Sequence, residues 1–144
     1  MPWTAQTADD VPLPRRDVWT SMKRGCRGRC PHCGEGRLFR AFLKVCERCP
    51  VCDEDLTHQR ADDFPAYIVI VIVGHLLVPA ALFVETAFQP PIALQLAVWL
   101  PFAVILSLAL LQPVKGAIVG LQWALRMHGF GTYPDADALP GRES

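Results

Sequence analysis

The sequence predicts a membrane protein with three parts: a small cysteine-rich β head, a two-helix hairpin and a C-terminal interfacial helix. Charge is divided unevenly along its 144 residues. Residues 1–63 contain 11 of the 14 Lys and Arg, 10 of the 14 Asp and Glu and all six Cys, whereas residues 64–114 contain one formal charge, Glu85. Two apolar runs, 64–84 and 92–111, match the roughly 20 residues that span a bilayer. A chain this short cannot bury both runs in a soluble core, so we expect both to cross a membrane.

Changes in composition mark the expected boundaries. The first 22 residues are rich in proline and mixed in charge, without periodicity, which is typical of a disordered tail. The other parts are expected at 23–61 for the head, 62–112 for the hairpin, 113–128 for the interfacial helix and 129–144 for a flexible tail.

Within the head, glycines mark turns on the N-terminal side of the segment "RLFRAFLKV", residues 37–45. This segment is expected to form a strand, because its aromatic residues and glycine-rich lead-in favour a hairpin over a helix.

The first membrane helix has recognisable start signals. Asp63 is expected as its N-cap, and Pro65 falls in the first turn, where a missing N–H is tolerated. The link 85–91 is short, so the second helix must turn straight back. Pro113 is expected to end or kink that helix.

Residues 113–128 are expected to form a helix in the membrane interface. Lys115, Gln122 and Arg126 fall on one stripe, and Trp123 suits headgroup depth. A continuation of the second span is the alternative. Gly116 and Gly120 form a small-xxx-small pair, which predicts a helix contact such as a homo-oligomer interface.

The distribution of Lys and Arg predicts the topology. The sequence before the first span carries 11 of them, the link carries none, and the sequence after the second span carries three. Positive residues mark the cytoplasmic side, so both termini are expected in the cytoplasm and only the link outside.

Cysteine spacing predicts a metal site. The cytoplasm is reducing, so a disulfide framework is not expected. Cys30-x2-Cys33 and Cys49-x2-Cys52 are separated by 15 residues, which fits the zinc pattern of paired knuckles. Two tight turns can aim four sulfurs at one ion, and such a closed site argues for structure rather than catalysis. Zn2+ is the expected metal, with Fe in the same geometry as the minority option. The expected fold class is therefore a small zinc-ribbon-like β head, a transmembrane helical hairpin and an interfacial helix.

Two cysteines are left over. Cys46 also pairs with Cys49 at CxxC spacing, so the register of the second knuckle has an alternative. Cys26 and Cys46 are either incidental reduced thiols or ligands of a second soft ion such as Cu(I).

Several polar residues lie at or in the expected spans. His58, Asp62 and Asp63 fall at the cytoplasmic mouth of the first helix, where carboxylates suit the helix dipole and a second ion site or a docking contact is the functional alternative. His75 falls near the bilayer midplane. It is expected to hydrogen-bond a neighbouring helix through Gln95 or Gln112, with haem or copper ligation as the alternative.

Some functions are not supported by any motif. The formal net charge is zero and no basic run forms a patch, so nucleic acid is not an expected partner. The sequence contains no nucleophile–base constellation, P-loop or dinucleotide fingerprint, so we expect a non-enzymatic protein.

Three segments together resemble an uncharacterised family of small alphaproteobacterial inner-membrane proteins: "RGRCPHCGEGRLFRAFLKV", "RADDFPAYIVIVIVGH" and "LLQPVKGAIVGLQWALRMHG". The resemblance covers about residues 23–130. It implies a zinc-ribbon-like head, two membrane helices, no established activity and genetic association with cytochrome c oxidase and its assembly factors. The family's second knuckle looks like C-x-x-C-G, where this chain has Asp53. Cys26 and Cys46 fall where the family usually has other residues.

The expected function is that of a scaffold or assembly accessory for a respiratory membrane complex in the bacterial inner membrane, in contact with a membrane-protein partner. Handling of copper or haem, and a redox role for the CxxC pairs, are the alternatives.

Overall fold

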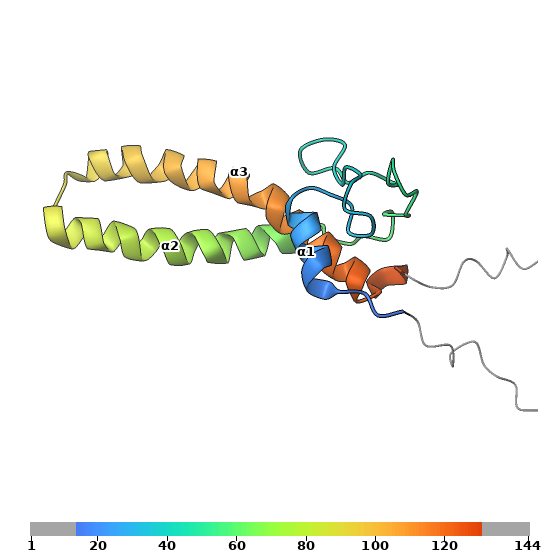
Figure 1. Cartoon of the computed structure of the whole chain (residues 1–144). Coiled ribbons are helices and arrows are strands. Elements are labelled where there is room, and N and C mark those ends of the chain that lie inside the picture. Colours follow the sequence, from blue (N-terminus) through green and yellow to red (C-terminus); the bar gives the residue numbers. More distant parts are fainter. Residues whose placement is uncertain (1–13, 131–144) are drawn as a thin grey trace, which may run out of the picture.

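A computed structural model describes residues 14–130, and the tails expected at 1–13 and 131–144 lie outside the described residues. Its elements are α1 (Val18–Cys26), α2 (Phe64–Phe88), α3 (Ile92–Ala124) and a short 3-10 helix, η2 (Met127–Gly129). In Figure 1, α2 and α3 form a long antiparallel hairpin, and the loops of the head gather with α1 around its base.

The predicted hairpin is confirmed as two long apolar helices. Asp63 is the N-cap of α2 as expected, with Pro65 in the first turn, although the Asp63 carboxylate makes no capping hydrogen bond. The helix runs to Phe88, four residues beyond the predicted end, and stops where Gln89 adopts a left-handed conformation with φ of 45°. Pro91 then caps α3.

The surroundings of the two helices indicate a membrane protein. Both are long and apolar enough to cross a membrane. Their most apolar 18-residue windows are only 11% buried in α2 and 0% buried in α3. A core helix of a soluble domain would be mostly buried, so these side chains need an apolar medium around the protein.

The separate interfacial helix predicted at 113–128 is wrong. α3 continues through Pro113 as one helix to Ala124. Its final turns are covered by the head, and the polar stripe expected on them is broken because Gln122 is buried. The pattern misled because an apolar helix end inside a small domain looks the same in sequence as one lying on a bilayer.

The β head is not confirmed. Within residues 14–130 the head contains only isolated antiparallel bridges, including Phe39 with Val45, and no strand. The segment 37–45 turns too tightly for a ladder, and the adjacent Leu38 and Phe39 are both buried. A strand buried on one face would instead alternate between core and solvent.

The head takes its core from α3 rather than from a sheet. Leu38, Phe39, Leu56 and Ala61 from the loops pack with four side chains of α3 and with Phe130. Phe130 is only 1% exposed, so the predicted C-terminal tail begins later than residue 129. The α3 members of this core are Ile118, Val119, Trp123 and Ala124.

Helix α1 begins inside the stretch that was predicted as a tail, so that prediction is wrong from Val18 onward. Asp17 caps the helix by accepting a hydrogen bond from the backbone N–H of Trp19. A Cβ on Gly116 would overlap the carbonyl oxygen of Gly25, and one on Gly120 would overlap that of Ser21. The two glycines predicted for a homo-oligomer contact are therefore packed against α1 of the same chain.

Candidate metal centre

The first knuckle, residues 30–36, is a tight turn closed by backbone hydrogen bonds. The N–H of Gly34 donates to the carbonyl oxygen of Cys30 over 2.9 Å, and that of Gly36 donates to the sulfur of Cys33 over 3.4 Å. Gly34 has φ of 76°, a value that glycine adopts without steric cost. The N–H of Gly36 directs partial positive charge at the sulfur of Cys33, which favours a thiolate there.

The second knuckle, residues 49–54, repeats this turn with a different residue at its corner. The N–H of Asp53 donates to the carbonyl oxygen of Cys49 over 3.0 Å, and Asp53 has φ of 57°. Aspartate is among the few non-glycine residues that adopt this conformation without large strain. Asp53 therefore lets the second knuckle close in the same kind of turn as the first.

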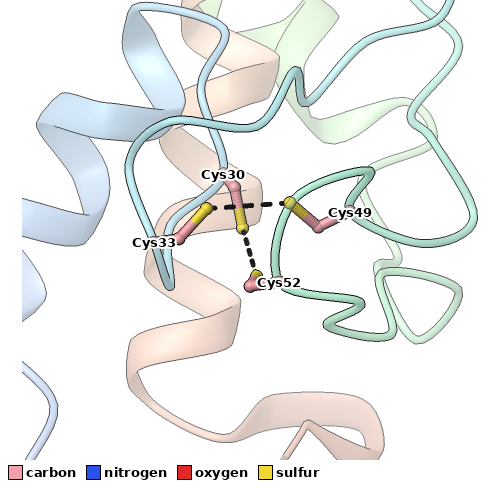
Figure 2. Close-up of side chains that lie close together, drawn as sticks. All are labelled: Cys30, Cys33, Cys49 and Cys52. Carbon is pink, nitrogen blue, oxygen red and sulfur yellow. Dashed lines mark hydrogen bonds between the residues drawn. The ribbon is translucent and has the colours of Figure 1, made fainter.

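The two knuckles bring together the four predicted ligands Cys30, Cys33, Cys49 and Cys52. Their sulfurs lie within 4.8 Å of one another. Two pairs of sulfurs, Cys30 with Cys52 and Cys33 with Cys49, are 3.7 Å apart and are joined by dashed lines in Figure 2. A tetrahedral ion with metal–sulfur bonds of about 2.3 Å requires edges of about 3.8 Å. The donor set therefore fits a four-coordinate thiophilic ion.

Burial of the site shapes the metal-free thiols. Burial raises the pKa of Cys30 and of Cys52 above the ordinary thiol value. For Cys33 burial acts in the same direction, but hydrogen bonds from the backbone N–H groups of Gly36 and Glu35 outweigh it and lower the pKa to about 7. Four thiolates in this space need a cation, and a bound metal deprotonates its thiol ligands outright.

Gly36 is a part of the site that the sequence identified only as a turn. A Cβ at this position would overlap the sulfur of Cys49. The backbone of the first knuckle therefore lies directly against a ligand from the second, and only glycine leaves room for that sulfur.

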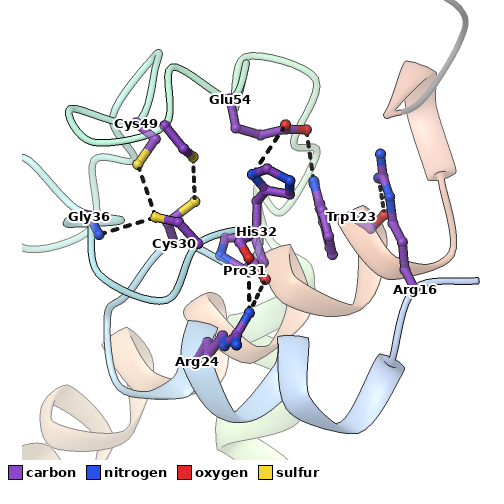
Figure 3. A network of polar contacts seen from close by, with 11 residues as sticks. Arg16, Arg24, Cys30, Pro31, His32, Gly36, Cys49, Glu54 and Trp123 are labelled. Atoms are coloured by element: carbon purple, nitrogen blue, oxygen red, sulfur yellow. Dashed lines mark hydrogen bonds and ion pairs between the residues drawn. The ribbon is translucent and has the colours of Figure 1, made fainter. Parts of the chain in front are cut away.

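Trp123 joins the metal site to α3 (Figure 3). Its indole N–H donates to the carboxylate of Glu54 over 2.8 Å. The same carboxylate lies 4.0 Å from Nδ1 of His32, whose ring centre is 5.6 Å from that of Trp123. His32 belongs to the first knuckle and Glu54 to the second, so one side chain of α3 contacts both.

Two arginines complete this network. The guanidinium of Arg16 stacks 4.0 Å from the ring centre of Trp123 and donates to its carbonyl oxygen over 2.8 Å, at the C-terminal end of α3. A cation suits that end of a helix. From α1, Arg24 donates to the carbonyl oxygens of Pro31 and His32.

Gln122 fastens the loop that leads into α2. Its side-chain oxygen accepts from the N–H of Arg60 over 3.0 Å, and its NH2 group donates to the carbonyl oxygen of Arg60 over 2.8 Å. The Gln122 side chain therefore supplies the two hydrogen bonds that a neighbouring strand would otherwise give to the backbone of Arg60.

The other candidate residues lie apart from the cysteine cluster, which is the one group of three or more metal-type side chains found close together in residues 14–130. His58 lies 3.7 Å from Asp55 and edge-on to Phe130. The other candidate residues belong to no such group; they are Cys26, Cys46, Asp62 and Asp63.

His75 is exposed on α2, and its ring makes a hydrogen bond within the same helix. Its Nδ1 is 2.8 Å from the carbonyl oxygen of Val71, one turn earlier in the same helix. Gln95 donates instead to Glu85 at the far end of the hairpin. The predicted bond from His75 to a neighbouring helix is thus replaced by a bond within α2.

The residues that sequence reasoning missed are those that hold the knuckles to the helices, namely Arg16, Arg24, His32, Gly36, Glu54, and the structural roles of Gln122 and Trp123. One signal was available: Gln122 and Trp123 follow a glycine pair, and close helix contacts bury the positions beside such glycines. The loop partners carry no comparable pattern.

Fold and site together define a class: a hairpin of two helices that are long and apolar enough to span a membrane, joined to a head with a candidate tetrathiolate metal centre. The chain belongs to the DUF983 family, described as proteins of unknown function, whose sequence profile matches residues 39–123. The match includes the second knuckle and both long helices, and it begins after the first knuckle. No curated protein and no solved structure matches the chain.

Proposed function

We propose that this protein is a non-enzymatic, zinc-organised platform anchored in the bacterial inner membrane, with its head and both termini in the cytoplasm. The observation that carries the proposal is the sulfur geometry of Cys30, Cys33, Cys49 and Cys52, with two edges of 3.7 Å and every ligand atom within 4.8 Å of the others. Four thiolates saturate a tetrahedral Zn2+ and leave no position for a substrate.

A structural role for the ion is also supported by the head itself, which has few other interactions to stabilise it. The head has no sheet in residues 14–130, and its core contains nine buried side chains, four of them supplied by α3. A domain of this size needs an additional constraint, and metal binding can supply folding energy directly.

The head is also held rigidly to the membrane part. α3 is one helix from the hairpin to the knuckles, and Trp123 and Gln122 connect it to Glu54 and Arg60. Such a head holds a fixed height and orientation above the bilayer, which suits a scaffold or assembly accessory that positions a membrane-protein partner. A respiratory complex, with cytochrome c oxidase as the candidate that the resemblance implies, is the partner that we propose.

The first test is elemental analysis of protein purified from membranes in mild detergent. One zinc per chain, lost together with the folded head when Cys30 or Cys49 is changed to Ser, is the expected result. Copper, co-purifying haem, or iron in addition to zinc would contradict the structural role and favour cofactor handling.

The second test is chemical crosslinking in intact membranes, followed by identification of the captured membrane protein. We expect the wild-type chain to capture a subunit or assembly factor of a respiratory complex, and the Cys30→Ser chain to lose it while staying in the membrane. His75→Ala, which leaves the knuckles untouched, is the matched control and should retain the partner. Equal capture by wild type and Cys30→Ser would contradict the platform.

A further inference from the structure

The segment 39–45 forms a small hairpin-like turn at the edge of the head. Phe39 and Val45 are paired across an antiparallel bridge, and the N–H of Arg40 donates to the carbonyl oxygen of Lys44 over 2.9 Å. Three apolar residues, 41–43, are left at its tip. In Figure 1 this loop, coloured cyan, lies on the side of the head nearest the hairpin.

The base of this tip packs against α3 just beyond the second apolar run. Phe39 is buried against α3, where its ring would lie 3.3 Å from a Cβ on Gly116. Gly116 comes five residues after Leu111, the last residue of the second apolar run, which is about 7.5 Å along a helix. The headgroup region extends roughly 5–7 Å beyond the hydrocarbon on each side, so Gly116 falls at the outer edge of this region when Leu111 marks the end of the hydrocarbon. Lys115 lies at the same level, where a long basic side chain reaches the phosphates.

The side chains of the tip suit lipid rather than water. Phe42 is 50% exposed, although the head has few apolar residues with which to build its own core. Arg40 and Lys44 flank the tip, and within the described residues their side chains make no hydrogen bond or ion pair. An exposed aromatic residue between two unpaired cations fits an anionic membrane surface.

We propose that the tip 40–44 inserts into the cytoplasmic leaflet of the bilayer that the hairpin spans, with Phe42 among the acyl chains and Arg40 and Lys44 on the phosphates of anionic phospholipids. The insertion rests on the proposed anchoring of the hairpin and goes beyond it by assigning a second membrane contact to the metal head. With α2 and α3, the tip holds the head at a third point and stops it from tilting.

Photo-crosslinking tests this contact directly. p-Benzoylphenylalanine is placed at position 42 in the full chain, which is then reconstituted in vesicles of phosphatidylglycerol and phosphatidylcholine. Illumination is expected to give a covalent phospholipid adduct, identified by intact mass. The matched control is the same amino acid at Val51, which is 59% exposed on the second knuckle. Val51 belongs to the knuckle whose Glu54 contacts Trp123, seven residues further along α3 than Gly116, and should give several-fold less adduct.

The role of charge is tested in the same chain with Arg40→Glu and Lys44→Glu together. The lipid adduct at position 42 is expected to fall several-fold in phosphatidylglycerol vesicles and to show less dependence on lipid charge than the parent. An adduct with a second protein in native membranes, or equal lipid adducts at positions 42 and 51, would overturn the insertion.

The same samples separate this inference from the proposed function. Resistance to carbonate extraction and zinc content are measured beside the adduct. A chain that keeps both, yet gives no lipid adduct at position 42, overturns the tip contact alone. A chain released by carbonate overturns the anchoring and the tip contact together.

Discussion

The two parts of α3 have opposite surroundings although they form one continuous helix. Residues 92–112 expose large apolar side chains over most of their circumference, whereas Gly116 to Ala124 are mostly buried by loops and by α1. The side chains of the first part need an apolar solvent, whereas those of the second part belong to the core of the head. Composition is similar in both, so hydropathy alone cannot tell lipid-facing from core-facing sequence.

The same difference indicates which interactions stabilise the hairpin and which stabilise the head. The two long helices depend on apolar surroundings and on backbone hydrogen bonds inside each helix. The head depends on the four cysteines and on side chains that satisfy irregular backbone. Perturbing the head should therefore leave the hairpin in place, and the following predictions test that separation.

The largest effect is expected for Cys30→Ser. Loss of one thiolate leaves three sulfurs around the ion, and metal binding energy is folding energy in a domain of this size. Hydrogen exchange should lose protection throughout residues 28–60 and at the end of α3, while α2 and the first part of α3 stay protected. Loss of protection in the hairpin as well would show that the two parts are not independent.

Gly36→Ala should come next. The new Cβ overlaps the sulfur of Cys49, so either the ligand or the first knuckle must move. Changes around metal ligands typically lower affinity about 10–100-fold, and we expect a loss in that range. Competition with a zinc chelator measures it. Gly74→Ala is the control, because a Cβ there meets no atom within 4 Å and affinity should stay unchanged.

A pair of glutamines on α3 compares its two parts directly. Gln122→Leu removes both hydrogen bonds to the backbone of Arg60 and leaves that N–H and carbonyl without a partner. Such a loss costs about 1–3 kcal/mol, measured as a lower unfolding midpoint of the head. Gln112→Leu makes the same chemical change in the exposed part, where it should be neutral or favourable. Equal destabilisation by both would contradict the division of α3.

Several features of this comparison were predictable from the sequence because their cause is local. The spacing of Cys30 and Cys33, the charge-free run after Phe64 and the cap at Asp63 each depend on residues close together in the chain. The fold of the head was not predictable in this way. Trp123 meets Glu54 across 69 positions, and no local periodicity records that contact.

The same limit applies to the predicted strand at 37–45. Its residues have the composition of a strand, but the two knuckles and α3 supply the constraints that a sheet would otherwise provide. If one ion holds the four sulfurs, as we propose, the loops need only the few hydrogen bonds that orient the thiols. Tertiary context therefore overrides the local strand preference of this segment.

The smallest effect is expected at the corner of the second knuckle and compares the two CxxC turns. Asp53→Gly relieves a left-handed aspartate and removes an ion pair with Arg48 whose side chains are 64% and 75% exposed. Exposed pairs contribute little, and aspartate adopts this conformation without large strain, so the relief should only slightly outweigh the greater freedom of glycine in the unfolded chain and stabilise the head by less than about 0.5 kcal/mol. The measurement is the thermal midpoint of the zinc-loaded protein. The reciprocal change, Gly34→Asp, has a comparable φ but places its Cβ 2.8 Å from Nε of Arg24, so it should destabilise. If Asp53→Gly destabilised instead, the pair with Arg48 would matter more to the knuckle than its backbone strain.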